Sequence, residues 1–260
     1  MKREAIIFLI AGIGTIALLL LNLFSGAVNI PVSSVLRILC GGDVANASWR
    51  FIVLESRLPQ SLTALFAGGA LSVCGLLMQA VFRNPLADPS ILGVSSGAGL
   101  GVALVMLLLG GGIGMGSISI GGFVAVLAAA FMGAIAVTVM MLVLSRMIRS
   151  NAMLLIVGVM TGYLSSSAIM LLNYFASADG IRSYMLWGMG NFASVSLERL
   201  PLFIAVTTAC MVASVLLVKP LNILVLGSQY ARNLGVDTRR LRNGVLLLTG
   251  LMTAVTTAFC

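Results

Sequence analysis

The chain has 260 residues, of which 60% are hydrophobic and only 8% are charged, and its mean hydropathy is +1.15. Soluble domains carry about 25% charged residues, so this composition excludes a soluble globular protein and predicts a polytopic membrane protein. The formal net charge of +8 comes from basic residues spread over several loops, which favours a membrane topology signal over a nucleic-acid interface.

Seven apolar segments are long enough to cross the hydrocarbon core of a bilayer as helices, which takes roughly 20 residues. They lie near 5–24, 58–82, 91–109, 117–145, 152–176, 200–218 and 244–260. None shows the roughly ten-residue alternation that is typical of an outer-membrane barrel. We therefore predict an all-α membrane protein, a helical bundle that forms one transmembrane domain over residues 1–260.

The first segment is followed by Ser25, Gly26 and Ala27, which are compatible with a signal-peptide cleavage site. Its apolar run is longer than the roughly 7–15 residues of a signal peptide, which favours a retained first span over a cleaved leader.

The distribution of basic residues predicts the orientation, because cytoplasmic loops carry an excess of Lys and Arg. With the N-terminus in the cytoplasm, the inside loops hold Lys2, Arg3, Arg83, Arg146, Arg149, Lys219, Arg232, Arg239, Arg240 and Arg242. The outside loops then hold Arg37, Arg50, Arg57, Arg182 and Arg199. This bias favours a multi-pass protein with a cytoplasmic N-terminus.

The apolar segments lack the charged residues that ion transport or catalysis usually needs. No Asp, Glu, Lys or Arg lies deep in any of them, whereas ion-driven transporters usually keep such groups at the midplane. A sodium site built from carbonyls and hydroxyls would escape this test. The chain has no histidine, and Cys40, Cys74, Cys210 and Cys260 lack metal-type spacing, so we expect no metal, no cofactor and no catalytic residue.

ATP cannot bind here through a Walker A motif, because the only lysines are Lys2 and Lys219 and neither stands in such a motif. If ATP powers this protein, a separate partner chain hydrolyses it. We therefore expect a transport subunit and not an enzyme.

The most informative stretch is residues 57–101, where one apolar segment ends in a polar turn, Asn-Pro-Leu-Ala-Asp-Pro at 84–89. A second apolar segment then begins with Gly93, Gly97 and Gly101. Unpaired backbone groups in hydrocarbon cost several kcal/mol, so the turn lies at a membrane face or lines a water-filled path. A simple helix-breaking turn and a gate are both compatible with it.

The sequence from 57 to 101 resembles the FecCD-type permeases, the transmembrane subunits of ATP-driven importers for iron-siderophores, haem or vitamin B12. The resemblance extends over residues 50–260 and implies about ten spans. Cys260 falls inside an apolar run that begins near Gly244, so we expect a chain truncated at its C-terminus. A protein with seven native spans is the alternative.

The resemblance implies a cytoplasmic gate at two turns. Asn84 and Leu86 match the first constriction, and Asn151 and Ala152 match a second one in the turn between the fourth and fifth segments. From the residues alone, the second turn is equally well explained as a helix cap.

The inside loop from Lys219 to Asn243 is long for a simple connection and mixes apolar with basic residues. An interfacial helix that docks into a groove on a partner has this pattern, although basic residues also serve as topology signals. The resemblance implies that this is the ATPase coupling loop, with matching residues Gly227, Ala231, Leu234, Gly235 and Val236. Ser228 and Gln229 stand where family members commonly carry acidic residues.

Arg57, on the expected outer face, is either an interfacial arginine or a docking residue. The resemblance implies a salt bridge from Arg57 to a glutamate of a substrate-binding protein. Relatives often carry a second arginine where this chain has Gln60. We expect Tyr184 and Trp187 to be interfacial aromatics, and the resemblance implies that they shape the mouth of the pathway.

The assembly that the resemblance implies is a homodimer of permeases with two cytoplasmic ATPase subunits and one periplasmic or lipid-anchored substrate-binding protein. It implies a bacterial cytoplasmic (inner) membrane as the location. The competing hypothesis is a secondary transporter or channel that works alone, which would not need the coupling loop.

Overall fold

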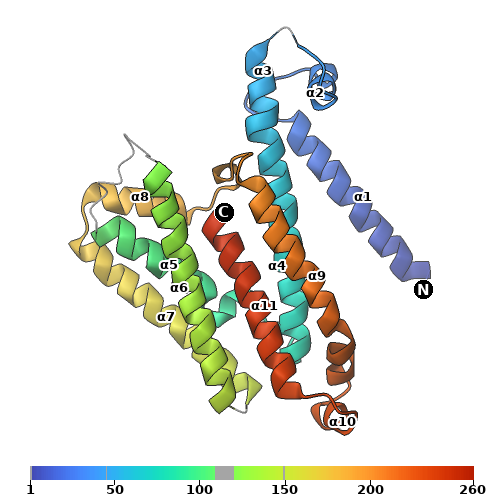
Figure 1. Ribbon diagram of the computed structural model, residues 1–260, viewed down its shortest axis with the longest axis vertical. Helices are drawn as coiled ribbons and strands as arrows, with labels where there is room; N and C mark the ends of the chain where they lie inside the picture. The colour runs from blue at the N-terminus through green and yellow to red at the C-terminus, as the bar shows by residue number, and fades with distance from the viewer. Residues whose placement is uncertain (1, 45, 109–119, 149) are drawn as a thin grey trace. The chain divides into compact units, whose positions relative to one another are not determined.

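The computed structural model describes residues 2–44, 46–108, 120–148 and 150–260 (Figure 1). Helices make up all of the regular secondary structure in these residues, which confirms the all-α prediction. The chain divides into two compact units, Met1–Phe66 with Phe192–Ile204, and Ala67–Asn191 with Ala205–Cys260. The two units are described separately.

The first unit begins with α1 (Lys2–Phe24), whose side chains are almost all exposed, as expected of a helix that faces lipid. It continues with α2 (Val32–Leu39), α3 (Ala47–Phe51), the π-helix η1 (Ile52–Arg57) and the start of α4 (Leu58–Phe82). A 3₁₀ turn, η4 (Phe192–Ser194), also belongs to it. Ile30, Val35, Ile38 and Val53 form its small apolar core.

One continuous helix runs from Ala47 to Phe82, because η1 joins α3 to α4. At about 1.5 Å per residue, its 36 residues extend for roughly 54 Å, well beyond a hydrocarbon core of about 30 Å. The sequence predicted a span that starts at 58, beside Pro59. Pro59 instead follows a π turn, in which the Leu58 N–H donates to the Val53 carbonyl, and the helix passes through it.

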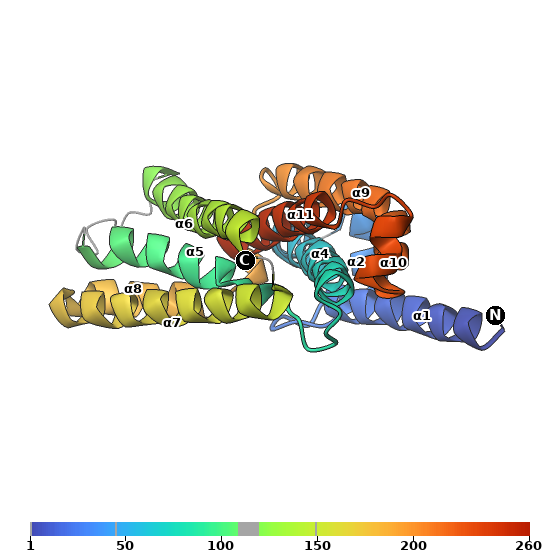
Figure 2. The same ribbon diagram turned by 90° about the horizontal axis from the view of Figure 1, so that it is seen from below.

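The second unit holds the end of α4 and the helices η2 (Pro89–Leu92), α5 (Val94–Ala103), η3 (Leu104–Leu108), α6 (Ile120–Met147) and α7 (Asn151–Phe175). It also holds α8 (Ala178–Gly188), most of α9 (Leu200–Val225), α10 (Ser228–Asn233) and α11 (Thr238–Phe259). Figure 2 shows α5 between α6 on one side and α7 with α8 on the other, and α5 contacts all three.

Glycines set the spacing of α5 and α6. A Cβ on Gly101 would overlap the carbonyl oxygen of Ala129, and a Cβ on Gly133 would overlap that of Gly97. The backbones therefore touch directly, which small residues at these positions allow. Gly93 ends η2 with a φ of +74°, so it both turns the chain into α5 and approaches α7.

Helix α11 has 12 buried residues and packs on α6 and α5. A Cβ on Gly250 would collide with the side chain of Thr138 in α6. On the α4 side, the Thr249 carbonyl accepts a hydrogen bond from the Cys74 thiol. The predicted segment 244–260 lies within this helix, which begins earlier, at Thr238.

Within the described residues, five helices are long and apolar enough to cross a membrane. They are Arg3–Phe24, Ala47–Phe82, Val124–Met147, Asn151–Phe175 and Leu200–Val225. The predicted segment 91–109 divides into η2, α5 and η3, with a shorter apolar helix at Val94–Leu107. Residues 109 and 117–119 of the predicted segments lie outside the described residues, as does Arg149. The structure thus establishes a helical membrane protein, and seven remains the number expected from the sequence.

Candidate functional site

The turn after α4 is held by its own backbone and by Asn84. Arg83 adopts a left-handed conformation with a φ of +53°, and the Asn84 N–H donates to the Gln79 carbonyl at 3.2 Å. This pairing satisfies a carbonyl that the end of a helix would otherwise leave free. The Asn84 Oδ1 accepts the Leu86 N–H at 3.0 Å, and the Leu86 side chain is 79% exposed. The turn therefore presents Leu86 outward from a fixed backbone.

Asp88 completes this turn, because its Oδ1 accepts the Ser90 N–H at 2.8 Å and caps η2. The residue types that the sequence marked as a turn thus serve as local caps, with Pro89 in the first position of η2.

The second predicted constriction lies at the start of α7. Ser150 is the helix cap, because its Oγ accepts the Met153 N–H at 3.3 Å. Asn151 has different partners: its Nδ2 donates to the Val81 carbonyl of α4 at 3.1 Å. Ala152 is exposed on the first turn of α7. The structure thus connects Asn151 to the last turn of α4, directly before Asn84, while among the described residues Leu86 and Ala152 make no such link.

Arg242, in the second turn of α11, joins the same cluster. It is 6% exposed, and its Nη1 donates to the Asn151 Oδ1 at 3.1 Å. Its Nη2 donates to the carbonyls of Ser145 and Ile148 at the end of α6, to the latter at 2.9 Å. Beside it, the Ser145 Oγ donates to the Asn243 Oδ1 at 2.8 Å. Side chains of α6, α7 and α11 and the backbone of α4 are therefore hydrogen-bonded at one end of this unit.

The predicted coupling loop is a short helix between two glycines. Gly227 and Gly235 have φ values of +141° and +80°, conformations that other residues rarely adopt, and α10 lies between them. Ala231 is completely buried, while Leu234 is 55% exposed. The Val236 N–H donates to the Ala231 carbonyl at 2.9 Å, which closes the end of α10. The loop is shorter than predicted, because α9 continues through Lys219 and Pro220 to Val225.

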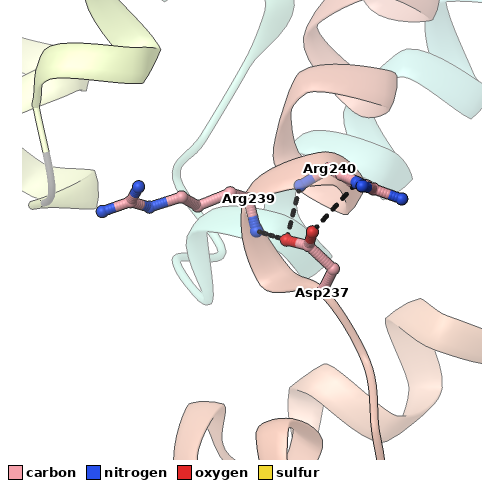
Figure 3. Close-up of polar contacts among 3 residues, drawn as sticks. All are labelled: Asp237, Arg239 and Arg240. Carbon is pink, nitrogen blue, oxygen red and sulfur yellow. Dashed lines mark hydrogen bonds and ion pairs between the residues drawn. The ribbon is translucent and has the colours of Figure 1, made fainter.

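Asp237 anchors the start of α11 (Figure 3). Its Oδ1 accepts the N–H groups of Arg239 and Arg240, both at 3.0 Å, and its Oδ2 pairs with the Arg240 Nε at 3.1 Å. The backbone N–H groups of Arg240 and Arg239 hold the pKa of this exposed carboxylate below its usual value. The Arg239 side chain extends away from Asp237. Helix α11 thus begins with a hydrogen-bonded N-cap directly after Val236, the last of the predicted coupling residues.

Arg57, in the first unit, is 5% exposed and turned toward the protein backbone. Its Nη1 donates to the carbonyls of Leu23 and Phe24 at 3.0 and 3.2 Å, and its Nη2 donates to the Val28 carbonyl. The last carbonyls of a helix have no partner within it, and a cation is favourable there. In this structure Arg57 therefore caps the end of α1, a role that the sequence did not suggest.

A profile of the FecCD transport family matches residues 14–260. The chain belongs to the FecCD transport family. This confirms the resemblance, which the sequence places over residues 50–260, and extends it back to residue 14.

Curated relatives of this FecCD-family chain are vitamin B12 import system permeases named BtuC. The one from Klebsiella pneumoniae is 36% identical over 218 residues, which cover 84% of this chain and 63% of the relative. The one from Yersinia enterocolitica is 37% identical over 245 residues, which cover 90% of this chain and 69% of the relative. The chain thus spans 63% of the first relative's length and 69% of the second's.

A solved structure shares the helical fold of this FecCD-family chain. It is described as a metal-chelate type ABC transporter in an inward-facing conformation, with a TM-score of 0.76 and 27% sequence identity. The match covers 94% of this chain and 72% of the other.

Arg242 is the residue of this FecCD-family chain that sequence reasoning missed, because it was counted only as a topology charge. A signal was present: Arg242, Val245, Leu246 and Thr249 recur at helical spacing, and all four are buried on α11. An arginine in line with such an apolar face is a candidate for a buried contact. Among the described residues, no group of three or more His, Cys, Asp or Glu side chains could hold a metal ion.

Proposed function

We propose that this chain is the transmembrane permease subunit of an ABC importer that moves an iron-siderophore, haem or cobalamin by alternating access. Membership of the FecCD transport family and the similarity to vitamin B12 import permeases support this function. The proposed assembly contains two permease copies, two cytoplasmic ATPase subunits and one periplasmic or lipid-anchored substrate-binding protein. Its place is the bacterial cytoplasmic (inner) membrane, with the N-terminus of the permease inside.

The geometry of α10 is the observation that carries this proposal. A six-residue helix between two glycines holds Ala231 inside and presents Tyr230 and Leu234, which are 52% and 55% exposed. Exposed apolar side chains on a small amphipathic helix suit a groove on another protein. Gly227, Ala231, Leu234, Gly235 and Val236 are the residues of the proposed coupling loop that docks on the ATPase, with Ala231 buried behind the exposed Leu234.

The two turns with Asn84, Leu86, Asn151 and Ala152 form the proposed cytoplasmic gate. Their support is the hydrogen bond from Asn151 to the last turn of α4, directly before the turn that contains Asn84 and Leu86. Arg57 is the proposed docking residue for a glutamate of the binding protein. That role requires the Arg57 guanidinium to leave the three carbonyls that it now contacts.

The test is the substitution Leu234→Glu in the natively expressed protein, purified in gentle detergent with its partners identified by mass spectrometry. A carboxylate in an apolar groove is costly to bury, so we expect the ATPase to be lost from the complex and uptake to fall at least about tenfold. Leu36→Glu is the matched control, since Leu36 is 49% exposed on α2, outside the proposed coupling loop. An unsubstituted permease that purifies without an ATPase, and whose uptake follows an ion gradient, would contradict the proposal.

A further inference from the structure

The buried Arg242 follows the proposed coupling segment, which here means residues 227–236. It contacts Asn151 in one of the two proposed gate turns. Arg242 follows α10 by one short connection, and Asp237 fixes that connection to the helix that carries Arg242. The guanidinium points toward the end of α6 and the start of α7. Any displacement of the start of α11 therefore moves this side chain.

The contacts of Arg242 reach the start of α7 directly and the last turn of α4 through Asn151. Its Nη1 holds the side-chain oxygen of Asn151, and the nitrogen of the same amide donates to the Val81 carbonyl. Val81 lies in the last turn of α4, directly before the turn with Asn84 and Leu86. Hydrogen bonds thus form a continuous path from α11 through α7 to α4.

The hydrogen bonds of Arg242 can be exchanged for others, because of the chemistry of its acceptors. All three acceptors of Arg242 are neutral oxygens, two backbone carbonyls and one amide. Exchange of one neutral oxygen for another strands no buried carboxylate, whereas the loss of a carboxylate partner would. The Arg242 Nε is buried and has no hydrogen-bond partner among the described residues, so a second arrangement that satisfies it would be favoured.

We propose that Arg242 is the positioning residue that transmits movement of the coupling segment to the gate turns. The inference rests on the proposed function, because it requires an ATPase that moves α10. Arginine is needed at this position because its planar fork reaches three acceptors in fixed directions, whereas the ammonium of lysine is a single point.

The experiment measures gate movement without a cargo. The substitution Leu86→Cys places a spin label on the exposed turn, in a Cys40→Ser background that removes the exposed native thiol. In the purified complex with its ATPase, the distance between the labels of the two permease copies is compared with and without ATP and vanadate. Three variants of the labelled protein are compared with it: Arg242→Gln, Arg242→Lys and Asn151→Ala. The control is Arg239→Gln, which removes an exposed arginine from the same helix.

We expect the nucleotide to shift the label distance in the parent and in Arg239→Gln. In the Arg242 variants and in Asn151→Ala, the ATPase stays bound and active, but the shifted population falls at least about fivefold. A merely structural role would change assembly or stability and leave the shift intact in the complexes that form.

The outcomes separate the two proposals. A parent complex without an ATPase, or without any nucleotide-dependent shift, overturns the proposed function. If the nucleotide shifts the label distance in the parent and shifts it equally in the Arg242→Gln or Asn151→Ala complex, only the role of Arg242 is overturned. Loss of assembly in all three variants assigns Arg242 to folding and also overturns its role in transmission.

Discussion

Arg57 and Gly26 are packed so closely that they constrain each other. An ideal Cβ on Gly26 would lie 2.7 Å from the Arg57 Nη2 and 2.9 Å from its Cζ. The guanidinium can reach the carbonyls of Leu23, Phe24 and Val28 only because residue 26 has no side chain. At the residue scale, the end of α1 depends on this pair.

We therefore expect Gly26→Ala to displace the Arg57 guanidinium and to destabilise the protein by about 1–3 kcal/mol, as overpacked substitutions do. Thermal unfolding in detergent measures this. The control is Gly12→Ala in α1, where nothing lies within 4 Å and alanine is the better helix former. Equal stability of the two variants would show that Arg57 is free to turn outward, as the docking proposal requires.

At the scale of elements, the crossing of α5 and α6 is set by backbone contact. Gly97 and Gly133 face each other, and a Cβ at either position meets the partner helix. The hydrophobic effect does not hold helices together in lipid, so van der Waals contact between closely packed backbones must do so.

We expect Gly133→Ala to push α6 away from α5 and to lower the midpoint of thermal unfolding, with a loss of about 1–3 kcal/mol. Gly75→Ala in α4 provides the comparison, because a Cβ there meets nothing within 4 Å. An unchanged midpoint for Gly133→Ala, measured beside Gly75→Ala in the same detergent, would mean that the two helices are not held at this distance.

The same elements show what the sequence could predict. Apolar length identified most of the long helices, because this signal is local. The start of the helix at Ala47 was missed because a proline at 59 ordinarily marks a beginning, whereas a π turn lets the helix pass through it. The break at Gly93 was missed because apolar residues continue on both sides of it.

The candidate site was less predictable than the fold. The position of the two turns and of the coupling segment follows from polar residues between apolar ones. The partner of Asn151 does not, because Arg242 lies 91 residues away along the chain. Only the folded arrangement shows that a charge counted for topology is buried among three acceptors.

At the scale of the whole molecule, the distribution of charge bears on orientation. Within the second unit, the ends of α4 and α6 and the start of α11 lie at the same end (Figure 1). These elements carry Arg83, Arg146, Arg239, Arg240 and Arg242, all on predicted inside loops. Their gathering at one end agrees with the rule that basic residues stay in the cytoplasm.

We expect a membrane-impermeant maleimide to label the exposed native Cys40 in intact spheroplasts, because residues 25–57 are predicted to lie outside. Leu234→Cys in a Cys40→Ser background should react only after the membrane is opened. The Cys40→Ser protein alone gives the blank. Labelling of Leu234→Cys in intact spheroplasts would reverse the predicted orientation.

The contacts of Arg57 also bear on when the chain could be cut. Proteases bind a substrate as an extended strand, and they use its backbone hydrogen-bonding groups to do so. Around Ser25 and Ala27, the carbonyls of Leu23, Phe24 and Val28 are already occupied by one guanidinium. Once Arg57 is in place, these carbonyls are therefore not available to a protease.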